Sequence, residues 1–83
     1  MSGADDGELL VAVVPKNARE EIRLSVGPYG RVVTFKAWVF YRNEGGLMLP
    51  SNRGLAFSID KLPEFTLAVG QTYQHARAQG LLE

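Results

Sequence analysis

The segment of this 83-residue chain with the clearest chemical potential is Arg31–Arg42, in which cations alternate with large aromatic residues. Successive side chains of a β-strand point to opposite faces, so every second residue belongs to one row. One row of the segment carries Lys36, Trp38, Phe40 and Arg42. Unpaired bases stack on aromatic rings, at about 1–3 kcal/mol per base, while cations contact phosphate. The row therefore predicts a surface for single-stranded nucleic acid, because a duplex hides its base faces.

The alternate row of the same segment is apolar, and we expect it to form the core. It consists of Val33, Phe35, Ala37, Val39 and Tyr41. Because the strand already has one row to bury, the row with the cations is expected to face solvent. In the alternative interpretation, Trp38 and Phe40 lie in a second core beneath a helix or a partner subunit. The row alone does not decide between the two.

Three more residues extend the predicted binding surface. Arg53 lies in a loop at residues 50–54, where a flexible cation is able to close over a nucleic-acid backbone. Tyr29 and Arg31 lie at a turn formed by residues 27–30, next to the row. A simpler interpretation stays open for two of them, since a loop arginine is often only solvated and a turn tyrosine often packs on its own turn.

Residues suited to catalysis or metal binding are sparse. The sequence has no cysteine and a single histidine, His75, without a carboxylate at the spacing that metal ligands require. Paired carboxylates occur at residues 5–6 and 20–21, but nothing implies the apolar pocket that turns one of two carboxylates into a general acid. We therefore expect no catalytic residue, no metal and no other cofactor.

The charged residues are distributed unevenly along the chain. The formal net charge is zero, which by itself argues against a nucleic-acid partner. Residues 15–53, however, contain seven cations and three carboxylates, whereas residues 1–14 contain three carboxylates and no cation. The basic middle is modest support for a polyanionic partner.

Turn signals and periodicity predict the elements that must position these residues. Residues 1–7 are small and polar and are expected to be a disordered tail, and residues 8–83 to form one domain. A helix is predicted to be capped by Asp60, with Pro63 in its first turn and Gly80 at its end. The chain is thus α+β, with four or five antiparallel strands and the helix laid at one side of the sheet. The predicted strands are 9–14, 22–26, 31–42 and 55–59, and the short apolar stretch 47–49 makes the count four or five.

Two further expectations concern assembly and location. One face of the predicted helix carries a dimer interface of Phe65, Val69, Thr72, Tyr73 and Ala76. This stripe adds apolar area that a small sheet cannot cover, so we expect a homodimer that does not dissociate easily. The longest apolar run, Leu9–Val14, is too short to span a bilayer, and the chain shows no secretory signal, so we expect no membrane and a cytoplasmic location.

The order of several short motifs resembles the positive cofactor 4 family, whose members are transcriptional coactivator-type proteins that bind single-stranded DNA, and the chain resembles a bacterial member. The motifs are Glu21–Ser25, Tyr29–Arg31, Phe35–Trp38, Pro50–Leu55 and Leu62–Phe65. The resemblance covers roughly residues 15–76. It implies a curved four-stranded antiparallel sheet followed by a helix. It also implies that two copies pair largely through the helix, with grooves for antiparallel single strands on their sheets.

The resemblance carries over to individual positions. Lys36 matches the strand cation of the family and Trp38 the aromatic residue that follows it. Arg31 matches the cation after the turn glycine, and Tyr29 the aromatic residue before it. Arg53 matches the second cation of a loop that the family writes as Pro-x-Lys-Lys-Gly.

One departure from the family motif leaves two hypotheses open. Asn52 replaces the first cation of that loop, which implies weaker and less salt-dependent binding. The first hypothesis is a homodimeric, non-enzymatic single-stranded DNA-binding protein that regulates transcription, with RNA as an alternative ligand and the transcription machinery as a further partner. The second is a dimeric protein–protein interaction module on the same fold with little or no nucleic-acid affinity, which the zero net charge favours. A small-ligand binder has no support beyond the aromatic residues.

Overall fold

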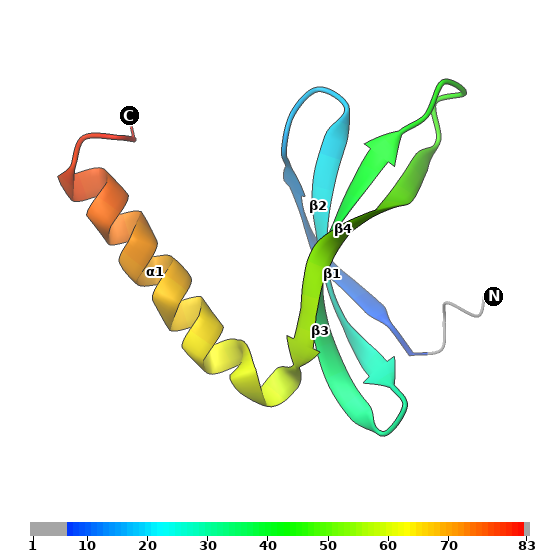
Figure 1. Ribbon diagram of the computed structural model, residues 1–83, viewed down its shortest axis with the longest axis horizontal. Coiled ribbons are helices and arrows are strands. Elements are labelled where there is room, and N and C mark those ends of the chain that lie inside the picture. Colours follow the sequence, from blue (N-terminus) through cyan, green and yellow to red (C-terminus); the bar gives the residue numbers. More distant parts are fainter. Residues whose placement is uncertain (1–6, 83) are drawn as a thin grey trace.

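The protein is described by a computed structural model that covers residues 7–82 and consists of four strands followed by one helix (Figure 1). The strands are hydrogen-bonded in sequence order, and each pairs antiparallel with the next. The predicted α+β arrangement is thereby confirmed. The predicted tail at residues 1–7 lies outside the described residues except for Gly7. The elements are β1 (Leu9–Pro15), β2 (Glu20–Tyr29), β3 (Val32–Arg42), β4 (Met48–Ser58), a 3₁₀ turn (Ile59–Lys61) and α1 (Leu62–Ala78).

A loop was predicted at residues 50–54, and that prediction is wrong, because β4 continues through these residues. Trp38 pairs with Gly54 and Phe40 pairs with Pro50, so residues 51–53 stand opposite Val39 as an insertion within one strand. The proline, serine and glycine that predicted a loop here serve a β-bulge instead, which interrupts the pairing without ending the strand.

The turn between β2 and β3 is shorter than predicted. Tyr29 pairs with Val32, so only Gly30 and Arg31 remain outside the strands. Gly30 has a φ of 66°, a conformation that favours glycine in such a tight turn.

The apolar row of β3 lies on the sheet face from which the helix begins. The ring centroid of Phe35 is 5.1 Å from that of Phe57 on β4, and Phe65 in the first turn of α1 completes the cluster at 6.2 and 5.2 Å. Phe35 is 7% exposed and is the one apolar side chain among residues 7–82 that is buried. This aromatic cluster anchors the helix to the sheet.

Beyond its first turn the helix extends away from the sheet, so the prediction that it lies along one side is wrong for the single chain (Figure 1). Asp60 does not cap it either, because Asp60 lies in the 3₁₀ turn and accepts a hydrogen bond from the Ser58 hydroxyl. The residue that caps α1 is Lys61, without a side-chain bond, and Pro63 lies in the first turn as predicted. Gly80, at φ 73°, follows the end of the helix.

This geometry leaves much apolar surface uncovered. Val69 and Tyr73 on α1 are 51% and 50% exposed, and Val33 and Leu55 on the sheet are 46% and 44% exposed. The radius of gyration is 15.0 Å, compared with about 12 Å for a compact chain of this length. Residues 7–82 include no helix with the length and apolar character needed to cross a membrane.

Candidate nucleic-acid interface

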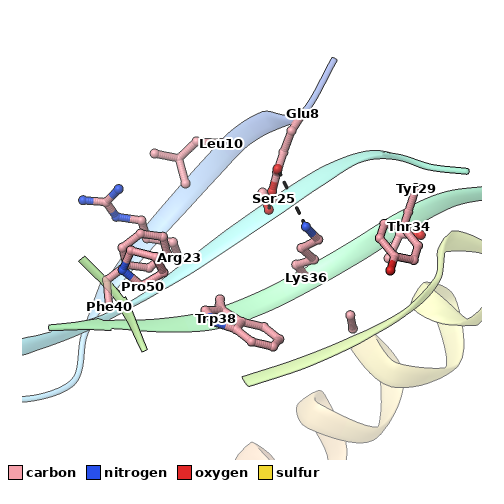
Figure 2. A pocket seen from close by; sticks show the side chains of 11 residues that line it. Glu8, Leu10, Arg23, Ser25, Tyr29, Thr34, Lys36, Trp38, Phe40 and Pro50 are labelled. Carbon is pink, nitrogen blue, oxygen red and sulfur yellow. Dashed lines mark hydrogen bonds and ion pairs between the residues drawn. The ribbon is translucent and has the colours of Figure 1, made fainter. Parts of the chain in front are cut away.

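A groove of about 670 Å³ runs over the sheet face opposite the aromatic cluster (Figure 2). All four strands contribute to it because the cross-strand pairs of the row with Lys36 and Trp38 point to the same side: Arg23 is paired with Trp38, and Ser25 with Lys36. Its lining comprises Glu8, Leu10, Arg23, Ser25, Tyr29, Thr34, Lys36, Trp38, Phe40, Pro50 and Ala56. Four of the seven predicted binding residues thus line one groove: Tyr29, Lys36, Trp38 and Phe40.

The bulge of β4 holds Trp38 in place. The indole nitrogen donates a hydrogen bond to the backbone carbonyl of Ser51 at 2.8 Å. A Cβ on Gly54 would lie 2.4 Å from the indole ring, so the ring packs against the bare glycine backbone. The side chain is half-buried yet still lines the groove, and the helix starts from the other face of the sheet. The row therefore does not form a second core beneath the helix, which was one half of the alternative interpretation. The other half, a core beneath a partner subunit, is not tested by a single chain.

Phe40 is covered by an arginine that the sequence analysis did not assign to the site. The guanidinium of Arg23 lies 4.3 Å from the centroid of the Phe40 ring, within the range of a cation–π contact. Arg23 Nε also donates to Glu21 Oε2 at 2.6 Å. Arg23 lies within the predicted strand 22–26, but its position beside Trp38 depends on the pairing of β2 with β3. The flat guanidinium therefore covers one face of the Phe40 ring.

The polar part of the groove lies around Lys36, between Trp38 and Thr34. Its Nζ lies 3.8 Å from Glu8 Oε1, and the hydroxyl of Ser25 donates to Glu8 Oε2 at 2.7 Å. Ser25 is 7% exposed, which makes it one of two buried polar side chains among residues 7–82, with Thr34. Lysine, serine and glutamate therefore meet on the floor of the groove.

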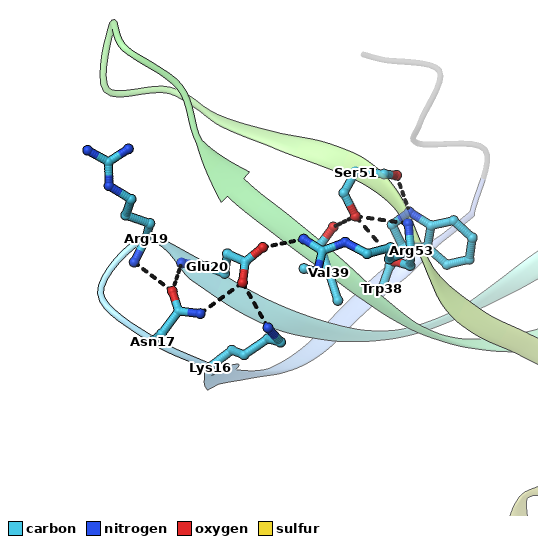
Figure 3. Close-up of polar contacts among 8 residues, drawn as sticks. All are labelled: Lys16, Asn17, Arg19, Glu20, Trp38, Val39, Ser51 and Arg53. Carbon is cyan, nitrogen blue, oxygen red and sulfur yellow. Dashed lines mark hydrogen bonds and ion pairs between the residues drawn. The ribbon is translucent and has the colours of Figure 1, made fainter.

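Arg53 does not line the groove, although it was predicted to contact nucleic acid together with Lys36. Its guanidinium forms an ion pair with Glu20, which pairs with Tyr41 at the end of the apolar row (Figure 3). Lys16 and Asn17 each donate to the same carboxylate at 2.8 Å. Hydrogen bonds from Lys16, Arg53 and Asn17 lower the pKa of Glu20 to about 2. Arg53 thus serves a carboxylate-centred network that ties β4 to the turn after β1.

The remaining predicted cations lie at the ends of the sheet. Arg42 donates to the backbone carbonyl of Gly46 at 3.4 Å and lines a separate pocket of about 210 Å³ together with Arg19. Arg31 is exposed in the turn between β2 and β3. The structure brings neither of them into the groove.

Comparisons with known proteins bear on the fold. No protein-family profile matches the sequence, and no curated protein matches it either. Among solved structures, the chain is similar to the crystal structure of a PC4 homolog from Burkholderia pseudomallei, with a TM-score of 0.72 and 19% sequence identity over 82% of this chain and 92% of that chain. The fold is PC4-like. The resemblance to the positive cofactor 4 family, drawn from motif order, is confirmed at the level of the fold.

Charges on this PC4-like sheet are largely paired. The groove holds two cations, Arg23 and Lys36, and each has a carboxylate partner, Glu21 and Glu8 respectively. Outside the groove Glu20 pairs with both Arg53 and Lys16. The groove is therefore an aromatic channel with little net charge rather than a strongly basic one.

The helix of the PC4-like fold presents the predicted interface residues along one stripe. Phe65 belongs to the aromatic cluster, and Val69 and Tyr73 are about half exposed. Thr72 donates its hydroxyl hydrogen to the carbonyl of Ala68, and Ala76 is half-buried where the backbone of Leu81 folds back on it. Between these two ends of the stripe, Val69 and Tyr73 stay about half exposed in the described part of the chain.

Proposed function

We propose that this protein binds single-stranded DNA in the groove described above, as a homodimer and without a catalytic step, and that it acts in transcription. The observation that carries the proposal is the position of Lys36 and Trp38 side by side in one groove of a PC4-like sheet. A flat ring next to a cation suits a nucleotide, which combines a flat base with an anionic phosphate. The role in transcription follows from the resemblance to the positive cofactor 4 family, and a cytoplasmic location follows from that role.

Base stacking is assigned to Trp38 and Tyr29. Trp38 is held by the bulge, so little conformational freedom is lost when a base stacks on it. Tyr29 is 73% exposed at the other end of the groove lining and is able to rotate onto a base. Phosphate contacts are assigned to Lys36 and Arg23. Base stacking favours single strands, since paired bases offer no free face. Stacking and phosphate contacts are both available to RNA as well as to DNA.

A second copy of the chain is the proposed cover for the exposed apolar stripe. Phe65 and the sheet form one apolar surface that continues along Val69 and Tyr73, and several of its side chains are about half exposed in the single chain. Two copies related by a two-fold axis would bury it against itself. The radius of gyration, larger than a compact monomer requires, supports the same conclusion.

Titration of a labelled oligo-dT with the protein at low salt tests the proposal. We expect saturable binding in the micromolar range and a clear preference for the single strand over a duplex of equal length. Absence of binding at tens of micromolar, or equal binding of the duplex, would contradict it.

The paired charges favour a second candidate function, a protein–protein interaction module on the same dimeric fold. Because Lys36 and Arg23 already have carboxylate partners, the groove gains less from a polyanion than an unpaired basic groove would. A partner that stays bound at high salt and after nuclease treatment would favour this candidate, and release by nuclease would exclude it.

A further inference from the structure

A carboxylate lies in the middle of the groove, beside Lys36. Glu8, directly before β1, contacts both Ser25 and Lys36 with its two oxygens, at 2.7 and 3.8 Å (Figure 2). Ser25 is 7% exposed, so its hydroxyl has little access to water and relies on Glu8 as its acceptor. The carboxylate thus takes up both of the donors that this part of the groove offers.

A glycine on the neighbouring strand β2 leaves room for Glu8 beside Ser25 and Lys36. Gly27 on β2 lies so close that a Cβ on it would stand 2.6 Å from the Cα of Glu8 and 3.0 Å from its Cβ. Any residue other than glycine at position 27 would push Glu8 away from the sheet. The backbone of Glu8 therefore packs against Gly27 while its carboxylate contacts Ser25 and Lys36. A loose ion pair between surface side chains lacks such a backbone contact.

We infer that Ser25 and Lys36 form a phosphate subsite of the groove, and that Glu8 holds this subsite as an internal competitor. The inference rests on the proposed function and adds the regulation of that same site. A cation beside a hydroxyl donor is a suitable pair for one phosphodiester oxygen or two. The Glu8 carboxylate has the same sign of charge and the same kind of acceptor atoms, so it stands where a phosphate of the bound strand would lie.

The competition has a signature in the salt dependence of binding. When Lys36 exchanges a carboxylate for a phosphate, the freed Glu8 attracts a cation from solution, and this uptake offsets part of the counterion release from the nucleic acid. In a variant without the Glu8 carboxylate no cation is taken up, so nothing offsets the counterion release from the nucleic acid. For single strands, one phosphate contact contributes about 0.7 to the slope of log affinity against log salt. Loss of the Glu8 charge should therefore steepen the slope by up to about 0.7.

Glu8→Gln and Gly27→Ala test the inference by two different routes, with Glu44→Gln as the matched control. Labelled oligo-dT is titrated with each full-length variant at several salt concentrations. Glu8→Gln should bind on the order of 2- to 5-fold more tightly at low salt, with the steeper slope. Gly27→Ala should also bind more tightly although it changes no charge. Glu44→Gln removes a carboxylate from the turn after β3, outside the groove, and should behave as the wild type.

The outcomes separate the inference from the proposed function. If Glu8→Gln binds oligo-dT with the same affinity and salt dependence as the wild type, the inference that Glu8 is an internal competitor is overturned. The same holds if Glu44→Gln gains as much affinity as Glu8→Gln. Either result leaves the proposed function intact. Absence of binding by the wild type and by Glu8→Gln alike would overturn both. Ser25→Ala in the Glu8→Gln background should lose part of the gain, and an undiminished gain would remove Ser25 from the subsite. If Gly27→Ala fails to fold, the comparison of Glu8→Gln with Glu44→Gln decides alone.

Discussion

The indole ring of Trp38 lies directly against the backbone of Gly54, at a place where a Cβ would come within 2.4 Å of the ring. Ser51, three residues earlier in the same bulge, accepts the hydrogen bond of the indole nitrogen. One bulge thus supplies both the space for the largest side chain of the groove and the bond that fixes its orientation. The bulge in β4 therefore fixes the Trp38 indole as a flat aromatic surface in the groove.

Gly54→Ala should therefore disturb the platform. The added methyl group must displace the indole, at a cost of roughly 1–3 kcal/mol in the free energy of unfolding. Binding of oligo-dT should weaken, and the fluorescence maximum of Trp38, the one tryptophan of the chain, should shift. Gly45→Ala is the control, because its nearest neighbour would be the Asn43 side-chain oxygen at an ordinary 3.5 Å. Equal behaviour of the two variants in urea unfolding and in binding would contradict this account of Gly54.

Lys36→Gln should weaken binding to all oligonucleotide sequences about equally, since Lys36 is assigned to phosphate rather than to base edges. We expect a loss on the order of 2- to 5-fold at low salt. The slope of log affinity against log salt should become shallower by less than about 0.7, because cation uptake by the freed Glu8 carboxylate already offsets part of the release at Lys36. Lys61→Gln removes the same charge from the 3₁₀ turn, outside the groove, and should leave both quantities unchanged. A loss confined to certain base sequences would show that Lys36 reads bases.

Strand alternation allowed the sequence to predict much of the site. Lys36, Trp38 and Phe40 share a face because a period of two is a local property of an extended chain. The same reasoning placed Phe35 in the core, where it is the buried apolar side chain of the described residues. Local signals also predicted the helix, because Pro63 and Gly80 mark its two ends.

What the sequence could not provide was the pairing of distant segments. Arg23 enters the groove because β2 pairs with β3 in one particular register, which places it beside Trp38. Arg53 leaves the predicted site because the bulge directs it to Glu20, 33 residues away in the chain. Glu8 looked like part of an acidic end of the chain, and only the structure shows its carboxylate between Ser25 and Lys36. Each of these placements depends on contacts between strands rather than on local composition.

The network around Glu20 predicts a pH dependence of stability. Hydrogen bonds from Lys16, Arg53 and Asn17 lower the pKa of Glu20 from 4.5 to about 2 in the folded chain. A carboxyl with a depressed folded pKa contributes stability that is fully present above its unfolded pKa and is lost as the pH falls through the folded one. Glu20→Gln should therefore have a lower urea midpoint than the wild type above pH 4.5, and the difference should shrink toward pH 2. With Glu44→Gln as the control, a difference that stays constant over this range would refute the assignment.

If the proposed dimer forms through the stripe, a carboxylate on one side of α1 should disrupt it and a carboxylate on the other side should not. Val69→Glu puts a carboxylate into the exposed apolar stripe, which should convert the dimer into a monomer at micromolar concentration. Gln74→Glu adds the same charge on the far side of the helix, five residues along, and should leave the mass unchanged. Light scattering measures both. A monomeric wild type, or a dimer that persists in Val69→Glu, would show that the stripe is not the interface.

Bases are proposed to stack on Trp38, and the fluorescence of this single tryptophan is the most direct measurement of that contact. Unlabelled oligo-dT is added to the unmodified protein at low salt while the indole emission is recorded. We expect quenching that saturates at the same concentration as the binding of labelled oligo-dT, with little change on addition of a matched duplex. Saturable binding of the labelled strand without any change in the indole emission would contradict it.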